Sequence, residues 1–121
     1  MTPRTRPVSW IRAVLKEFEA FPEGARSICL TALTIAAEGS KADIAKPMRG
    51  MGSGVLEIAL AFKGDAFRVV SAVQLAKEIW VSEELWVIDA FQKKSTHGIK
   101  TPKREVDLMR DRLKTLKETL R

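Results

Sequence analysis

Cysteine is almost absent from this chain, which has a single cysteine, Cys29, among 121 residues. One cysteine cannot form an internal disulfide, and its position in an apolar helical stretch predicts a reduced thiol in the core. Long apolar runs are also absent, because none approaches the ~20 residues that a membrane-spanning helix needs. The N-terminal segment leads into an amphipathic helix instead of a signal-peptide core. We therefore expect a cytoplasmic protein with no membrane association.

Nucleotide-binding signatures are missing as well. Residues 40–54 are rich in glycine and carry the cations Lys46 and Arg49, but the run lacks a Gly-Lys-Ser/Thr ending and no helix follows it. This excludes a nucleotide P-loop and predicts a connecting loop. With 45% hydrophobic residues, the chain is long enough for one domain, residues 1–121, with a modest core.

Positive charge is unevenly distributed along the chain. Residues 1–90 contain 11 Lys and Arg against 11 Asp and Glu, whereas residues 91–121 contain 10 against 4, so the last quarter carries the whole net charge of +6. Such a basic patch indicates a polyanionic partner, although a solvated lysine-rich helix would have the same composition.

Apolar periodicity predicts three helices and three strands. Residues 10–18 and 23–38 have helical spacing and form a hairpin, and the charged, leucine-bearing stretch beyond Pro102 forms a terminal helix. Strands are predicted over residues 55–62, 67–75 and 85–90, with residues 76–84 as a lengthened hairpin connection. This order gives an α+β fold with helices on one face of an antiparallel sheet and the other face open.

The second strand places one cation on that open face. Phe67 and Val69 alternate with Arg68, so Arg68 points away from the side with aromatic and branched residues. After the third strand, residues 91–102 hold three lysines, three hydroxyl residues and the only histidine, and end on Thr101-Pro102, predicted as a helix cap followed by the first helical residue. We expect a basic concavity suited to an RNA backbone.

Three segments together resemble one protein family. They are Lys46-Pro47-Met48-Arg49-Gly50-Met51-Gly52 with Gly54-Val55-Leu56-Glu57-Ile58, then Gly64-Asp65 with Phe67-Arg68-Val69-Val70, and finally Ala90 to Ser95 with Gly98 to Glu105. In this order and spacing, they resemble the phage-derived, HigB-like branch of the RelE/ParE toxin superfamily. The resemblance extends from about Trp10 to about Leu113 and implies a RelE-like fold: an N-terminal helical hairpin, a three- to four-stranded antiparallel sheet and a C-terminal helix.

The resemblance also implies a function. Such a protein is the toxin of a type II toxin–antitoxin system, an mRNA interferase that cuts messenger RNA on the ribosome without metal or cofactor and is neutralised by an antitoxin of helix-turn-helix type. Arg68 matches the strand arginine that contacts the scissile phosphate, and Lys93 and Lys94 match the basic pair after the last strand. We add His97 as a proton-transfer group because histidine titrates near neutral pH. The predicted RNA-binding residues are Lys46, Arg49, Lys100, Lys103 and Arg104.

The sequence departs from the family pattern at three places. A basic residue usual in the first strand is replaced by Ala59, after Glu57-Ile58, and tyrosines usual in the second strand are replaced by Phe67 and Ser71. These departures remove acid and base groups, so two alternatives stay open. One is a non-catalytic binding module of the same fold that inhibits a target such as a DNA topoisomerase, and the other is a degenerate prophage remnant.

Overall fold

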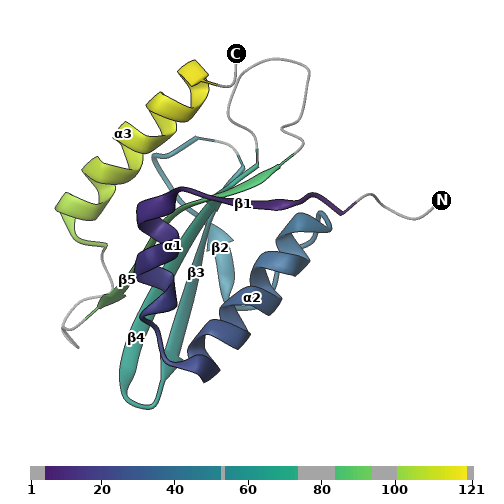
Figure 1. The fold of residues 1–121 in the computed structure, drawn as a ribbon, viewed down its shortest axis with the longest axis vertical. Coiled ribbons are helices and arrows are strands. Elements are labelled where there is room, and N and C mark those ends of the chain that lie inside the picture. Colours follow the sequence, from purple (N-terminus) through teal and green to yellow (C-terminus); the bar gives the residue numbers. More distant parts are fainter. Residues whose placement is uncertain (1–4, 53, 74–83, 94–100, 120–121) are drawn as a thin grey trace.

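The computed structural model describes residues 5–52, 54–73, 84–93 and 101–119 and contains an α+β domain (Figure 1). The elements in chain order are β1 (Val8–Trp10), α1 (Arg12–Glu19), α2 (Glu23–Ala37), β2 (Ala45–Pro47), β3 (Val55–Phe62), β4 (Asp65–Ala72), β5 (Leu85–Lys93) and α3 (Lys103–Thr119). Among the helices described, none has the length and apolar character needed to cross a bilayer. The predicted long connection at residues 76–84 lies outside the described residues.

The sheet has the strand order β1-β5-β4-β3-β2. Strands β3, β4 and β5 pair antiparallel in this order, as predicted. Strand β2 pairs antiparallel with β3 inside the segment predicted as a connecting loop, so that prediction was wrong for Ala45–Pro47, and β1 adds an edge strand parallel to β5. The sequence did not predict β1, because three residues are too few to show an alternation and the helical spacing predicted over residues 10–18 already includes Trp10. Trp10 is nonetheless a packing residue, with its ring centroid 4.8 Å from that of Phe18.

Helices α1 and α2 cover one face of the sheet (Figure 1). The predicted alternation in β3 is confirmed, since Ile58 and Leu60 are buried in this core, with Leu56 and Phe62 packed against it. Cys29 of α2 is fully buried, and burial raises the pKa of its thiol to about 11. A thiol with such a pKa is inert at neutral pH, as expected for a core residue.

The prediction that all helices lie on one face was wrong, because α3 packs on the opposite face (Figure 1). Its apolar stripe, formed by Met109, Leu113 and Leu116 with Val106 beside them, contacts side chains of the second face. The buried residues that this stripe packs with lie on the sheet and in the loop before β3, and they are Met51, Val55, Val70, Ala72 and Ile88. Central strands with branched residues on both faces need cover on both, so the terminal helix has its partner within the chain.

Candidate nucleic-acid interface

Among the described residues, no helix covers the second face of the sheet around Arg68, which lies outside the cluster under α3. In β4, Arg68 lies directly opposite Ala59 of β3 and Phe91 of β5. Its neighbours Phe67 and Val69 are buried in the core under α1 and α2, so Arg68 is on the opposite face, as predicted. Residues paired across strands share a face, so Ala59 and Phe91 lie beside it.

Small side chains surround this arginine toward the end of the sheet. The next cross-strand row pairs Ala61 with Ala66 and Ala66 with Lys93. None of these three belongs to the cluster under α3, and Lys93 is half-buried at the end of β5. Ala59, Ala61 and Ala66 lie in two adjacent cross-strand rows, and their methyl side chains rise only a little above the backbone. Arg68 and Lys93 therefore border a part of the sheet that carries small side chains.

The guanidinium of Arg68 is oriented by the backbone. Its Nη1 donates to the carbonyl oxygen of Phe67 at 3.0 Å, and the residue is half-buried. In the described part of the chain no carboxylate forms an ion pair with Arg68. An arginine has five N–H donors, so most remain available to an anionic ligand. This arrangement suits a phosphate, whose oxygens match the planar fork of a guanidinium.

A buried carboxylate connects this face to the start of α3. Glu57 is 7% exposed and accepts a hydrogen bond from Thr101 Oγ1 at 2.9 Å. Thr101 was predicted as the helix cap, but α3 begins at Lys103, and the carbonyl of Pro102 accepts the first helical N–H bond, from Val106 at 3.1 Å. The threonine hydroxyl therefore fixes the chain to β3 just before the helix.

A second buried carboxyl lies under α3 because of a β-bulge. The register between β4 and β5 shifts between Val70 and Ser71, which leaves Ile88 without a directly opposite residue. As a result Ile88 and Asp89 both lie on the α3 side. Arg112 of α3 donates through Nη1 to the carbonyl of Ile88 at 2.8 Å and to Asp89 Oδ1 at 3.2 Å.

The environment of Asp89 favours its neutral form. Burial, together with a hydrogen bond and like charge from Glu105, raises the pKa of Asp89 to about 8, while Arg112 and the N–H of Ala90 act in the opposite direction. Asp89 is 3% exposed, and its Oδ2 accepts no hydrogen bond from the described residues. A proton on this carboxyl allows it to donate toward Glu105, which fits the raised pKa.

The predicted site residues do not all fall on this surface. Lys46 lies opposite Glu57 on the same face and is exposed, and Arg49 is exposed in the following loop. Lys103 and Arg104 are exposed in the first turn of α3. Ser71 is 1% exposed and pairs with Leu56 and Val87 of the first core, so it is a core residue. The remaining predicted residues, Lys94, His97 and Lys100, lie outside the described residues.

Sequence reasoning missed the group of Asp89, Glu105 and Arg112. The sequence nevertheless carries an indication of it, because Asp89 is the one charged residue within the apolar run of residues 85–91. A buried aspartate requires a partner, and the partner had to come from another element. Across the described residues, His, Cys, Asp and Glu side chains form no group of three that would hold a metal ion.

Comparison with known proteins adds a family and a fold. The sequence model of the family described as phage derived protein Gp49-like matches residues 16–114. No curated protein matches the chain. Among solved structures, the chain is similar to E. coli toxin RelE, in a double-arginine mutant in the free state, with a TM-score of 0.57 and 18% sequence identity. The similarity covers 77% of this chain and 88% of the other. At this identity it shows a shared RelE-like fold.

Proposed function

The chain belongs to the phage-derived Gp49-like protein family, and from this premise we propose that it is the toxin of a type II toxin–antitoxin system. We place it in the HigB-like branch, as a cytoplasmic mRNA endonuclease that acts on ribosome-associated messages and needs no metal. A cognate antitoxin of helix-turn-helix type neutralises it. The observation that carries this proposal is the position of Arg68, on an open part of the sheet beside small side chains and next to Lys93.

The proposed reaction is an internal transesterification. The ribose 2′-oxygen attacks the adjacent phosphorus, the bond to the 5′-oxygen breaks, and the products are a cyclic phosphate and a 5′-hydroxyl end. Negative charge increases on the phosphoryl oxygens as the five-coordinate state forms. Arg68, fixed by its bond to the carbonyl of Phe67, supplies a cation to those oxygens, and a fixed cation stabilises the transition state more than the ground state.

Two proton transfers complete the reaction. One group accepts the proton of the 2′-hydroxyl, and another donates a proton to the leaving 5′-oxygen. We assign these roles to His97 with Lys93 and Lys94, on the chemistry of their side chains. Glu57 and Asp89 are poor candidates because both are buried, one bonded to Thr101 and the other to Arg112 under α3.

A second function has one observation in its favour. Ala59, beside Arg68, stands where the family resemblance implies a basic residue, and the neighbouring Ala61 and Ala66 supply no acid or base. A protein that uses this fold to dock on a target, such as a DNA topoisomerase, requires cations and shape but no proton transfer. We keep this non-catalytic inhibitor as the alternative, and a prophage remnant that binds only an antitoxin as a third.

Primer extension on a reporter message after induction separates these functions. We expect the parent to arrest growth and cut the message, and Arg68→Ala to reduce cutting by ~10²-fold or more, the typical effect of removing a group that stabilises transition-state charge. Arg12→Ala is the matched control, because Arg12 is an exposed arginine on α1 at the other face of the sheet. Circular dichroism establishes that each variant is folded.

Each alternative has its own outcome in this experiment. Growth arrest without cuts in any message supports the docking inhibitor, and absence of growth arrest contradicts the toxin assignment. His97→Ala identifies the proton-transfer group, since cutting that is unchanged leaves Lys93 and Lys94 in that role. Co-expression with the neighbouring reading frame tests the antitoxin, which we expect to co-purify with the chain and restore growth.

A further inference from the structure

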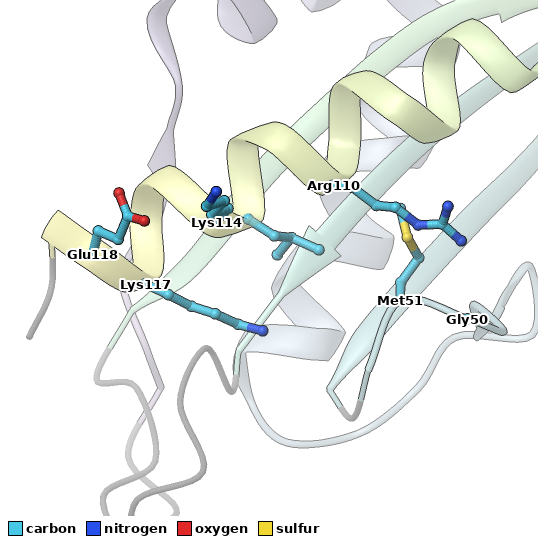
Figure 2. Close-up of a pocket in the computed structure, with 7 residues that line it drawn as sticks. Gly50, Met51, Arg110, Lys114, Lys117 and Glu118 are labelled. Carbon is cyan, nitrogen blue, oxygen red and sulfur yellow. The ribbon is translucent and has the colours of Figure 1, made fainter.

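A hollow of about 390 Å³ lies between α3 and the loop that precedes β3, apart from the Arg68 surface (Figure 2). Gly50 and Met51 form its loop side. The α3 side consists of Arg110, Leu113, Lys114, Lys117 and Glu118. Figure 2 shows Arg110 and Lys117 extending from the helix toward the loop that carries Met51.

Helical spacing gathers the three cations on one flank of α3. Arg110, Lys114 and Lys117 are four and three residues apart, so they project from one side of the helix. Arg112 projects from the opposite flank, toward Asp89. In the part of the chain that the structure describes, none of the three flank cations forms an ion pair. Their charge is therefore directed at the hollow and the solvent.

The loop side of the hollow offers backbone and little apolar surface. Met51 is 6% exposed and Leu113 is 5% exposed, so both are already covered by the core under α3. Gly50 has φ +79°, a backbone conformation that favours glycine, and Arg110 Nη2 lies 3.6 Å from where a Cβ would be, so the guanidinium lies beside this turn. A ligand in this hollow meets three cations, one carboxylate, peptide groups and the aliphatic parts of the lining side chains.

We propose that this hollow is a second contact site for the phosphodiester backbone of single-stranded RNA. The inference rests on the proposed function and deepens it, because it names where the RNA continues beyond the Arg68 surface. Lys114 is about 16 Å along the helix axis from Lys103, at 1.5 Å per residue, so the hollow contacts a part of the strand distant from α3's first turn. Exposed Arg49, next to Gly50, extends the cationic surface.

An acidic protein segment is the competing ligand, and the burial of the lining argues against it. Protein interfaces obtain their energy from apolar and aromatic anchors in a central pocket, whereas no aromatic side chain lines this hollow and its two apolar residues, Met51 and Leu113, are themselves buried. Phosphate contacts require only well-placed cations. Glu118 opposes an anion, and so does the C-terminal end of the helix dipole, so we place the phosphate toward Arg110 and Lys114.

The test measures binding of a fluorescent 2′-O-methyl RNA of roughly 15 nucleotides, a length within the range of single-strand binding sites. The 2′-O-methyl group removes the nucleophile, so binding is measured without cutting. Two double variants remove the same charge: Arg110→Gln/Lys114→Gln at the hollow, and Arg12→Gln/Lys16→Gln on the exposed side of α1. Anisotropy is recorded across a series of salt concentrations.

We expect the hollow variant to lower the slope of log affinity against log salt by about 1.4, which is 0.7 for each lost contact, and so to weaken binding roughly 25-fold at 0.1 M salt. The α1 variant should have a much smaller effect, and Glu118→Gln should strengthen binding. The inference is overturned if the two double variants lose equal RNA affinity or if neither loses any. It is also overturned if the unmodified protein does not bind RNA. If the hollow variant loses affinity for a polyglutamate peptide but keeps the affinity of the unmodified protein for RNA, the inference is also overturned. The hollow is then assigned to an acidic protein.

Primer extension on the same variants keeps the two proposals distinguishable. If the unmodified protein cuts messages and the hollow variant binds RNA as tightly as the unmodified protein does, the proposed function is supported and the second contact site is refuted. A parent that cuts no message, together with a loss of RNA binding confined to the hollow variant, refutes the nuclease assignment and sustains the contact site.

Discussion

The buried carboxyl of Asp89 should make the stability of this protein depend on pH in the opposite sense from an ordinary aspartate. Asp89 is 3% exposed under α3, bonded to Arg112 at 3.2 Å and to the N–H of Ala90 at 3.0 Å. Burial and Glu105 raise its pKa to about 8. The substitution Asp89→Asn preserves the acceptor oxygen, provides an amide that donates toward Glu105 and removes the titration.

The sign follows from proton binding in the two states. In the unfolded chain the aspartate pKa is about 3.9, so between roughly pH 4 and pH 8 the folded state holds a proton that the unfolded state has released. The stabilisation is complete below pH 4 and is lost as pH rises toward 8. At most about 1.4 kcal/mol is lost per pH unit and the loss levels off near pH 8, so we expect a loss of about 3–4 kcal/mol between pH 5 and pH 8. For a domain of this size, this lowers Tm by roughly 12–16 °C.

Urea denaturation followed by circular dichroism at pH 5, 6, 7 and 8 measures the effect. The free energy of unfolding of Asp89→Asn relative to that of the parent should rise by about 3–4 kcal/mol between pH 5 and pH 8. Asp107→Asn, at an exposed position of the same helix, removes the same charge and should leave the parent's pH dependence in place. The reasoning is refuted if the parent becomes more stable between pH 5 and pH 8, or if Asp89→Asn retains the parent's slope.

Two further substitutions test the packing of each face by urea denaturation. Gly24→Ala places a methyl group against the Phe62 ring, 2.8 Å from its Cε1, and should destabilise the protein by about 1–3 kcal/mol. In a Phe62→Leu background the same change should cost less, and an equal cost would show that the ring is not the obstacle. Thr101→Val removes the donor to buried Glu57 and should cost about 1–3 kcal/mol. Glu57→Gln keeps an acceptor and should cost less, so a larger loss than in Thr101→Val would contradict the assigned bond.

Local pattern in the sequence determined much of this fold. The alternation of Ile58 and Leu60 with Glu57 and Ala59 identified β3 and its core face, and the same period of two placed Arg68 on the face away from Phe67. These features depend on side-chain direction within a single strand, which the backbone geometry fixes. The helical hairpin was likewise predictable, because a buried helix face repeats every three to four residues.

Only the tertiary structure decided what the second face of the sheet became. The apolar stripe on α3 required cover, but its spacing does not specify which surface provides the cover, and the structure places Met109 against Val70 and Ile88. The bulge at Ile88 also depends on the pairing of β4 with β5, and it is this bulge that brings Asp89 beneath Arg112. The pairing of β4 with β5 and the packing of α3 on the sheet bring together residues that are far apart in the chain. The free energy of each contact depends on both partners, so the local sequence of one partner cannot predict it.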